Sequence, residues 1–376
     1  MPVPFNQPTL VGPEFQYMSE ALERSHLSGN GAFTKRCQLL LEKRLNVPRA
    51  LLTHSATGAL EMAAILAGIG PGDEVIMPSF TFCSTANAVV LRGGVPVFVD
   101  IRPDTLNIDE AMIEAAITPR TRAISVVHYG GVAAQMDAIM EIAGRHGLVV
   151  MEDAAQALHA DFRGQPLGTF GALSAFSFHE TKNLISGEGG ALVVNDAALA
   201  ERAEIIWEKG TNRAQFQRGE VARYTWVDIG SSFLPSELTA AFLYAQLEAG
   251  EEVTARRKAA WARYHVALAP MEDAGMLRRP RVPQECGHNA HIYFVLAPDG
   301  ERRDAALKAL AVEGVNAVMH YVPLHSAPAG QQYGRATGPL PVTDDLSARL
   351  IRLPLHPRIT PEEQAAVAGA LGRVLG

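Results

Sequence analysis

Short apolar runs alternate with helix-like segments through the first two thirds of the chain, and few folds accommodate this pattern. Runs of strand length occupy residues 73–78, 95–100, 123–128 and 148–153. Each run is almost continuously hydrophobic, as expected for strands of a sheet that is covered by helices on both faces. Residues 136–146 carry apolar side chains at helical spacing, and Gly147 follows as a C-terminal stop. The alternation predicts a doubly wound, mainly parallel α/β domain.

The pattern changes at about Pro235. Residues 236–252 predict a long helix, and residues 254–273 continue its helical character. The elements expected after this are a strand at 291–296, a helix at 303–313, a strand at 315–320 and a helix at 361–374. We therefore expect a large α/β domain at residues 1–245 and a smaller C-terminal α+β domain at residues 246–376, joined by the long helix.

Composition excludes several classes of protein. The 376 residues include 33 Lys and Arg against 40 Asp and Glu, a formal net charge of −7, and 48% of the residues are hydrophobic. This composition is that of a folded globular protein and excludes wholesale disorder. The mild acidity argues against a nucleic-acid binder, which needs concentrated Lys and Arg to neutralise phosphates. A local basic pocket for one phosphorylated ligand is compatible with it.

Common site and targeting signatures do not occur in the sequence. The cysteines, Cys37, Cys83 and Cys286, lie far apart and form no CxxC motif, so we expect neither a disulfide framework nor a cysteine zinc site. There is no HExxH, no GxxxxGK[ST] and no complete GxGxxG, so no metal, P-loop or NAD site is predicted. No secretory signal is visible, and no apolar stretch reaches the ~20 residues of a membrane helix. We expect a soluble, reduced, cytoplasmic protein.

One lysine stands between a strand-like run and a cluster of glycines. Residues 174–178 read Ser-Ala-Phe-Ser-Phe, Lys182 follows in a loop, and the glycines are Gly187, Gly189 and Gly190. A lone lysine in a loop is ordinarily a solvated charge. Apolar neighbours on one side and glycines on the other favour a packed lysine instead. Desolvation lowers the pKa of such an amine and frees it for Schiff-base chemistry.

A carboxylate stands at the end of an apolar strand, where the ligands of open α/β sheets collect. Asp153 ends the run 148–153, and one interpretation is that it caps the following helix. The alternative is a buried carboxylate that faces a cationic ligand atom. Asp153 lies 29 residues before Lys182, which leaves room for one more strand and loop. Both side chains can therefore meet at the carboxyl edge of the sheet.

Small hydroxyl residues precede a helix that we expect to run to about Ala67. They are Thr53, Ser55 and Thr57. Such residues are ordinary helix caps. A helix start also offers free amides and the positive end of the helix dipole, which suit a phosphate. From these residues by themselves, both interpretations remain open.

These three features, in this order and spacing, resemble the sugar aminotransferases of the DegT/DnrJ/EryC1/StrS family, fold-type I enzymes that depend on pyridoxal 5′-phosphate (PLP). The resemblance covers essentially the whole chain. Its motifs are residues 71–76, 78–82, 152–156, 176–182 and 187–190. Within the family, the chain resembles the branch of dTDP-4-amino-4,6-dideoxygalactose transaminases of surface-polysaccharide synthesis. This resemblance is carried by residues 178–183, 208–213 and 224–232. The resemblance implies a large doubly wound domain with a smaller C-terminal domain.

The resemblance also implies roles for residues around the PLP ring. Lys182 forms the internal aldimine with PLP and then moves a proton between C4′ of the cofactor and the α-carbon of the bound amine. Asp153 pairs with the pyridinium nitrogen and keeps it protonated, so that the ring acts as an electron sink. Gln156 hydrogen-bonds the phenolic oxygen, and Phe82 stacks on the ring. For Phe82 taken alone, core packing is the default interpretation.

For the phosphate of PLP, the resemblance implies contacts from the amides of Ala56 and Thr57, the Thr57 hydroxyl and Ser177. Many relatives also carry a Gly-x-Asn-x-Arg segment whose asparagine reaches the phosphate in the partner subunit. In this chain Ser232 holds the asparagine position and Leu234 the arginine position. A serine can still donate to a phosphate, but its reach is shorter.

Contacts to the sugar nucleotide are implied for a second group of residues. Tyr321 and His325 match the family's substrate-side segment, although a strand-end histidine in a polar loop fits the sequence equally well. His179, next to the strand that precedes Lys182, is a further candidate. Lys209 and Arg213 can meet the nucleotide diphosphate through charge-assisted hydrogen bonds, or they can be solvated residues of a loop.

The implied reaction has two halves. L-Glutamate gives its amino group to PLP, which leaves pyridoxamine phosphate and 2-oxoglutarate, and pyridoxamine phosphate then aminates the keto carbon of a nucleotide-linked (dTDP) 4-keto-6-deoxy-hexose. The family's active site lies at a dimer interface, so a homodimer with shared active sites is implied. The alternatives are amination at C3, a PLP-dependent sugar dehydratase, which we associate with histidine in place of Lys182, and a non-catalytic regulatory relative. Product stereochemistry and the nucleotide stay open.

Overall fold

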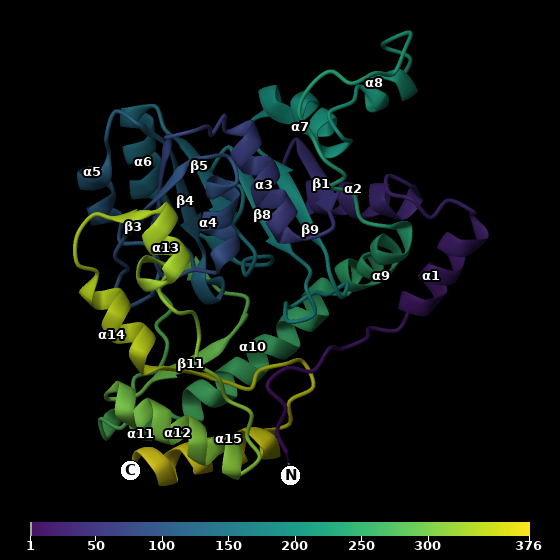
Figure 1. Cartoon of the computed structure of the whole chain (residues 1–376). Helices are drawn as coiled ribbons and strands as arrows, with labels where there is room; N and C mark the ends of the chain where they lie inside the picture. Colours follow the sequence, from purple (N-terminus) through teal and green to yellow (C-terminus); the bar gives the residue numbers. More distant parts are fainter. Residues whose placement is uncertain (1) are drawn as a thin grey trace.

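The computed structural model describes residues 2–376 and is built around one large sheet (Figure 1). Its eight strands lie in the order β1-β9-β8-β5-β4-β2-β3-β12. All pairs from β8 to β12 are parallel, whereas β9 runs antiparallel to both of its neighbours. The strands span Arg49–Thr53 (β1), Glu74–Pro78 (β2), Val95–Val99 (β3), Thr121–Val127 (β4), Val149–Asp153 (β5), Leu173–Ser177 (β8), Gly190–Val194 (β9) and Arg335–Ala336 (β12).

Helices cover both faces of this sheet, because successive side chains of each strand enter opposite cores. In β2, Ile76 packs into one core, while Val75 and Met77 pack into the other. The first core lies under α2 (Ala32–Leu45), α5 (Ile113–Ala116), α6 (Met136–His146) and α9 (Glu237–Glu248), with α1 (Glu14–Glu23) against α9. The second lies under α3 (Ala56–Leu66), α4 (Cys83–Val90) and α7 (Ala200–Trp207). The predicted doubly wound α/β fold is confirmed.

The strand runs expected from the sequence correspond to β2, β3, β4 and β5 within one or two residues. The helix expected at residues 136–146 is α6, which ends at Gly147 in the left-handed conformation with φ 64°. Glycine adopts this conformation without the steric cost that a Cβ imposes.

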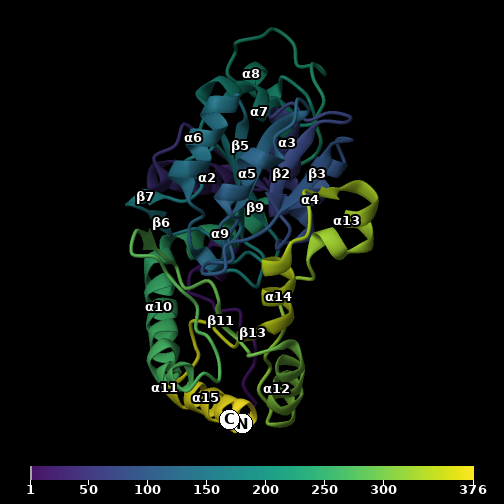
Figure 2. The ribbon, with the colours of Figure 1, turned by 90° about the vertical axis from the view of Figure 1, so that its left-hand side faces the viewer.

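The C-terminal part forms a smaller unit with its own core, seen below the large sheet in Figure 2. A two-stranded antiparallel sheet pairs β11 (Tyr293–Leu296) with β13 (Leu350–Leu353). The helices beside it are α10 (Gly250–Ala267), α11 (Ala269–Asp273), α12 (Gly300–Val312), α14 (Pro341–Arg349) and α15 (Pro361–Leu375). Helix α13 (Pro328–Tyr333) lies instead next to β3, at the edge of the large sheet (Figure 2).

The remaining elements are short. A small sheet is formed by β6 (Asp161–Phe162), β7 (Gln165–Pro166) and β10 (Cys286–Gly287). Helix α8 (Arg213–Gln217) lies in a segment that projects beyond the large sheet (Figure 1). The 3-10 helices span Glu110–Met112, Tyr129–Gly131, Ala197–Leu199 and Leu324–Ser326.

Two predictions for the C-terminal part were wrong in detail. The helix expected at residues 236–252 ends at Glu248, and α10 begins at Gly250 after a break at Ala249. The strand expected at residues 315–320 is extended chain with isolated bridges instead. Val315 bridges Val3, and Val318 bridges Arg352. Because the neighbouring chain changes within three residues, no continuous ladder forms there.

The division at residues 245 and 246 stays a prediction, and two segments cross it. Val3 packs into the core of the C-terminal unit, and β12 adds a strand to the edge of the large sheet beside β3. Within residues 2–376, no helix has the length and apolar character needed to cross a membrane.

Candidate active site

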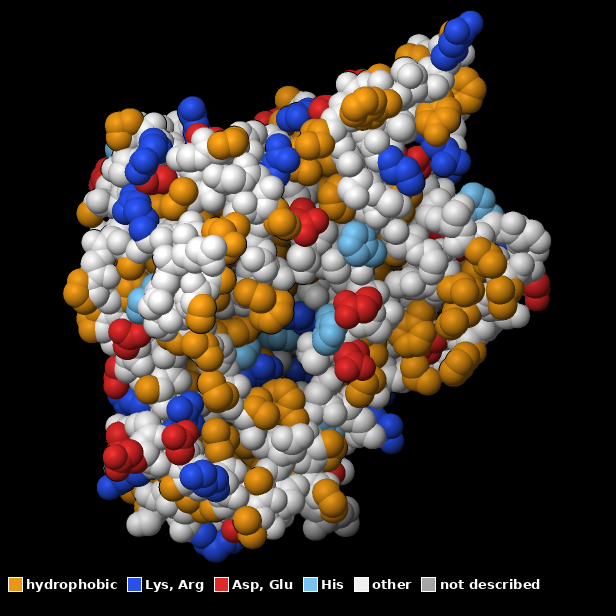
Figure 3. All heavy atoms as spheres, viewed as in Figure 1, with side chains coloured by type: hydrophobic (Ala, Val, Ile, Leu, Met, Phe, Trp, Pro, Cys, Tyr) orange, Lys and Arg blue, Asp and Glu red, His pale blue; other side chains and the backbone are white. Residues whose placement is uncertain are grey.

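A cavity of about 500 Å³ lies where the carboxyl edge of the large sheet meets the C-terminal unit. Figure 3 shows this hollow, with Lys or Arg and His side chains inside it. Its wall on the sheet side comes from residues that follow β1, β2, β5 and β8. The opposite wall comes from His291, His320, Tyr321 and Arg352. This is the edge where open α/β sheets bind ligands.

Lys182 enters the cavity from the loop that follows β8. Its backbone N–H donates to the carbonyl oxygen of His179 at 2.9 Å, which closes a turn under the side chain. Burial of the ammonium lowers the pKa of Lys182 from its ordinary value of 10.5 to about 8, against the opposing charge of Asp153. A substantial fraction of the amine is therefore neutral near pH 8 and can act as a nucleophile.

Asp153 is the last residue of β5 and is 5% exposed. Its carboxylate accepts hydrogen bonds from Thr85 Oγ1 at 2.7 Å and from the backbone N–H of Ala155 at 3.2 Å. Thr85 is bonded in turn to Thr81 at 2.8 Å between the hydroxyl oxygens. These contacts hold one orientation of the carboxylate on the cavity wall.

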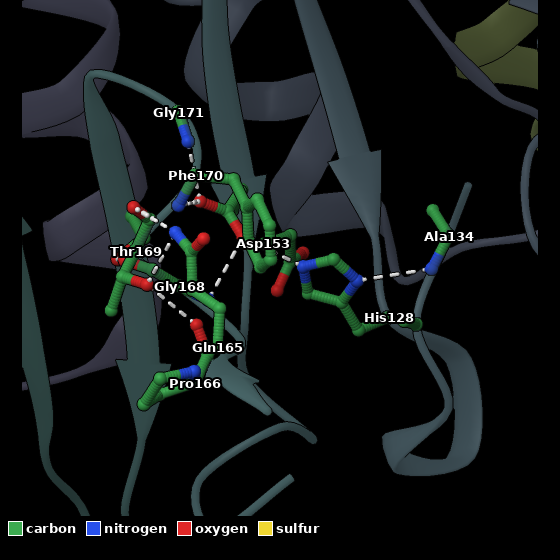
Figure 4. Close-up of polar contacts among 12 residues, drawn as sticks. His128, Ala134, Asp153, Gln165, Pro166, Gly168, Thr169, Phe170 and Gly171 are labelled. Carbon is green, nitrogen blue, oxygen red and sulfur yellow. Dashed lines mark hydrogen bonds and ion pairs between the residues drawn. The ribbon is translucent and has the colours of Figure 1, made fainter. Parts of the chain in front are cut away.

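The neighbouring residue on β5 anchors the strand end on its other side. The buried carboxylate of Glu152 accepts backbone N–H groups from Gly168, Phe170 and Gly171 at 2.8, 2.8 and 2.7 Å. It also accepts the Nε2–H of His128 at 2.9 Å, because Nδ1 of that ring accepts the N–H of Ala134 at 3.3 Å. Figure 4 shows His128 and the loop on either side of this strand end. The network holds β5, and with it Asp153, in place.

The start of α3 forms another part of the wall. Ser55 caps the helix by accepting the N–H of Gly58 at 3.0 Å, while Ala56 and Thr57 line the cavity. The first amides of a helix have no intrahelical acceptor, so they can bind an anion. A Cβ on Gly190 would lie 2.4 Å from the backbone nitrogen of Ala56. Glycine at that position therefore allows β9 to pack directly against the helix start.

Gln156 and Tyr321 connect the two sides of the cavity. Gln156 Nε2 donates to the Tyr321 hydroxyl at 2.9 Å, and its Oε1 accepts the N–H of Gly130 at 2.7 Å. Burial raises the pKa of Tyr321, so its hydroxyl remains protonated. The Tyr321 ring stacks on His320 with centroids 3.6 Å apart, and the 56% exposed Phe82 lies 6.2 Å away, centroid to centroid.

The structure thus brings most of the predicted site residues to one cavity: Ala56, Thr57, Phe82, Asp153, Gln156, Ser177, His179, Lys182 and Tyr321. His179 lies at its rim, with Nε2 3.6 Å from a carboxylate oxygen of Glu188. Ser177, the last residue of β8, accepts the N–H of His179 at 3.4 Å.

Four predicted residues lie outside this cavity in the single chain: Ser232, Lys209, Arg213 and His325. Ser232 forms an isolated bridge with Glu208, and Arg213 lies 3.7 Å from the same glutamate. Lys209 is exposed next to them. The His325 ring hydrogen-bonds the Ser79 hydroxyl at 2.7 Å and lies 3.3 Å from Asp344, so it ties segments together here.

The cavity residues that were not predicted include His291, His320 and Arg352 on the wall opposite the sheet. Burial lowers the pKa of both histidines well below its ordinary value, so both rings are neutral at pH 7. His291 Nδ1 pairs with Asn183 Oδ1 at 3.0 Å, and His320 Nδ1 pairs with the Tyr129 hydroxyl at 2.7 Å. The one available signal for Arg352 was its charge inside the apolar run 350–355.

The donor set fits PLP. A helix N-terminus suits the phosphate, a buried carboxylate suits the ring nitrogen, and a lysine of lowered pKa suits the aldehyde. Among residues 2–376, no three or more His, Cys, Asp or Glu side chains are grouped so that they could hold a metal ion.

Known proteins resemble this chain over almost its full length. The sequence profile described as the DegT/DnrJ/EryC1/StrS aminotransferase family matches residues 9–372. The spore coat polysaccharide biosynthesis protein SpsC of Bacillus subtilis (strain 168) is 34% identical over 369 residues, which are 96% of this chain and 94% of SpsC.

Solved structures also resemble this chain over almost its full length. The aminotransferase TlmJ from Streptoalloteichus hindustanus has a TM-score of 0.91 at 31% identity, covering 99% of this chain and 98% of TlmJ. The putative sugar aminotransferase Spr1654 from Streptococcus pneumoniae, in its PMP form, has a TM-score of 0.92 at 25% identity, covering 100% of this chain and 98% of that chain. The aminotransferases of this family depend on PLP. This chain belongs to the DegT/DnrJ/EryC1/StrS aminotransferase family.

Proposed function

We propose that this protein transfers the amino group of L-glutamate to a dTDP-linked 4-keto-6-deoxy-hexose, giving a 4-amino-4,6-dideoxy sugar for surface polysaccharide. The sugar aminotransferase family and the similarity to a polysaccharide biosynthesis protein support the general reaction. The particular sugar comes from the resemblance of residues 178–183, 208–213 and 224–232 to one branch of the family.

The observation that carries the proposal is the pairing of Lys182 with Asp153 in one cavity. When bound, PLP withdraws electrons from the carbon that carries the amino group. Asp153, fixed by Thr85, would keep the ring nitrogen protonated and so strengthen that withdrawal. The amine of Lys182, whose pKa burial lowers to about 8, would hold and return the proton of that carbon.

The other wall residues have matching tasks. The amides of Ala56 and Thr57 would hold the phosphate, with Ser177 beside them. Gln156 would turn from the Tyr321 hydroxyl to the phenolic oxygen of the ring, and Phe82 would cover the ring face. Tyr321 and His179 also line the cavity and would contact the sugar.

We further propose a homodimer with shared active sites. Lys209, Arg213 and Ser232 lie near the projecting segment and outside the cavity of their own chain. A second subunit would allow them to reach the phosphate or diphosphate in its site. His325 would contact substrate only after it releases Ser79, so we assign it the weakest role.

Borohydride reduction of the PLP-loaded protein, followed by peptide mass spectrometry and a turnover assay, tests the assignment of Lys182. We expect the label on Lys182 and no amination by Lys182→Ala. The matched control is Lys308→Ala, which removes an exposed lysine on α12 and should retain wild-type turnover. A label on another lysine, or unchanged turnover of Lys182→Ala, would contradict the proposal.

A further inference from the structure

Arg352 is a cation on the wall of the cavity with no anion beside it. It lies on β13, in the C-terminal unit, and faces the same cavity as Lys182 and Asp153. Its guanidinium carbon lies 4.8 Å from the centroid of the Phe5 ring. The backbone is held from both sides, since the N–H of Arg352 donates to Val318 and the strand pairs with β11. Its place in the cavity is therefore set by the fold.

The guanidinium lacks the partners that a buried charge normally has. Its Nε is buried without a hydrogen-bond partner, and no carboxylate of residues 2–376 forms an ion pair with it. Burial lowers the pKa of Arg352, a sign that the protein itself does not compensate the charge. Uncompensated burial of a charge is costly, and proteins generally pair such groups. A ligand anion is the missing partner.

The other charges of the cavity do not supply that anion. Asp153 is bonded to Thr85 and, in the proposed function, serves the ring nitrogen of PLP. Glu188 stands at the exposed rim beside His179. His291 and His320 are neutral, since burial lowers the pKa of each. With PLP bound, Arg352 would be the cavity's one uncompensated cation among the described residues.

We propose that Arg352 binds the α-carboxylate of the amino donor, L-glutamate in the proposed reaction on which this inference rests. The planar guanidinium presents paired N–H donors that match the two oxygens of a carboxylate. The α-carboxylate is attached to the carbon that carries the reacting amine, so it must lie close to the lysine end of PLP. Arg352 would thereby place that amine against the reacting carbon.

A sugar diphosphate is the competing anion, and its chemistry places it elsewhere. The diphosphate is attached at C1 of the hexose, across the ring from the keto carbon C4. When C4 is at the reacting end of PLP, the diphosphate therefore points away from it. Arg352, in contrast, lines the same cavity as Lys182 and Asp153, and its charge helps to lower the pKa of Lys182.

Donor discrimination in the first half-reaction tests the proposal. The PLP-loaded full chain is mixed with L-glutamate, with L-glutamine or with the α-amide of glutamate, and conversion of the cofactor is followed by its absorption. Wild type should discriminate strongly against the α-amide. Arg352→Gln should lose this discrimination and bind L-glutamate roughly 10- to 100-fold more weakly, as expected for loss of a charge-assisted pair. Arg352→Lys should recover part of the affinity.

A second readout is independent of turnover. Succinate, an unreactive dicarboxylate, is titrated into the PLP-loaded proteins by calorimetry, and its affinity should fall in Arg352→Gln. The matched control is Arg302→Gln, an exposed arginine on α12, which should bind succinate as wild type does. Circular dichroism of each variant verifies that it is folded.

Three outcomes would overturn the proposal. Unchanged donor discrimination and succinate affinity in Arg352→Gln would remove Arg352 from the donor site. Weakened binding of the sugar nucleotide, with the donor unaffected, would assign Arg352 to the diphosphate. Loss of discrimination against L-glutamine alone would assign it to the γ-carboxylate. Failure of the proposed function looks different, because wild type then aminates no keto sugar, while the succinate titration still reports on Arg352.

Discussion

Lys182 and Asp153 line one cavity, and in the proposed function they would act on opposite ends of PLP. Their surroundings differ accordingly. The carboxylate of Asp153 is held by Thr85 and by the backbone N–H of Ala155. Lys182 is held through its backbone while its amine stands in the cavity. Hydrogen bonds to its carboxylate suit Asp153 for a group that stays in place, whereas Lys182, in the proposed function, must carry a proton.

Covalent attachment of PLP to the apoprotein should depend on pH through Lys182. Below its pKa of about 8 the amine is protonated and has no free electron pair, so the rate at saturating PLP should rise with pH and reach half its maximum near pH 8. Stopped-flow absorption measures this rate. An unperturbed lysine would instead place the midpoint above pH 10, and that result would contradict the assigned burial.

The Asp153→Asn variant tests the direction in which Asp153 shifts the pKa of Lys182. The negative charge of Asp153 raises the pKa of Lys182 against the effect of burial. Without that charge the pKa should fall further, and the midpoint of attachment should move to lower pH. A shift to higher pH would show that Asp153 does not act on Lys182 in this way.

At the scale of elements, the carboxyl end of β5 is fixed from both sides. Glu152 binds the loop before β8, and Asp153 binds Thr85 of α4. His128, buried beside Glu152, accepts the backbone N–H of Ala134 with its Nδ1. The ring therefore cannot change tautomer without losing this hydrogen bond. The packing of three elements around this strand end therefore fixes the position of the Asp153 carboxylate.

Glu152→Gln should destabilise the protein by about 2–4 kcal/mol. A glutamine can accept two of the four hydrogen bonds, but its NH₂ group would face the N–H of Gly168 and the Nε2–H of His128. Denaturant titration measures the loss. PLP affinity should fall as well, because Asp153 is the next residue.

The control for this substitution is Glu141→Gln on α6. Glu141 forms an exposed pair with Arg145 at 2.6 Å, so its loss should cost less than about 1 kcal/mol. Equal stability changes in the two variants would show that the network around Glu152 does not anchor the strand.

At the scale of the whole molecule, exposed apolar side chains gather on the segment that carries α8. The segment around α8 projects from the molecule (Figure 1). Its aromatic and aliphatic side chains are exposed, up to 78% for Trp226. The members of this projecting patch are Phe216, Tyr224, Trp226, Val227 and Ile229. Contiguous apolar patches of this kind mark interaction sites. A second copy of the chain, as in the proposed homodimer, would cover it.

Trp226→Asp should therefore weaken the dimer, because it places a charge in the buried interface. Sedimentation velocity measures the change, and PLP affinity should fall with it if the two subunits share their sites. Val312→Asp is the control, since Val312 is 88% exposed on α12 and far along the chain from the patch. A dimer of unchanged stability in Trp226→Asp would contradict this interface.

Features of the fold that depend on one element or one motif could be predicted from the sequence. The strands β2 to β5 were predicted because they are buried on both faces and thus continuously apolar. The antiparallel course of β9 was not, since strand order depends on contacts between distant segments. The break at Ala249 was missed because helical spacing continues through it.

The candidate site residues also fall into two groups, those that have a recognisable local sequence and those that only the fold brings to the cavity. Lys182 and Asp153 stand in recognisable local settings, a loop before glycines and a strand end. Arg352 lies on a short strand of the other unit, and only the folded chain brings it to the same cavity. The position of Ser232 could be aligned with the family motif, but the fold of the single chain places it outside the cavity, bridged to Glu208.

Transfer of the nitrogen atom from donor to sugar tests the proposed reaction most directly. The PLP-loaded protein is incubated with ¹⁵N-labelled L-glutamate and dTDP-4-keto-6-deoxyglucose, and the sugar nucleotide is analysed by mass spectrometry. We predict a dTDP-amino sugar that carries the label, with 2-oxoglutarate formed in equal amount and neither product with Lys182→Ala. A sugar that only loses water, or one that stays unchanged while the protein is folded and PLP-loaded, would contradict the proposed amino transfer.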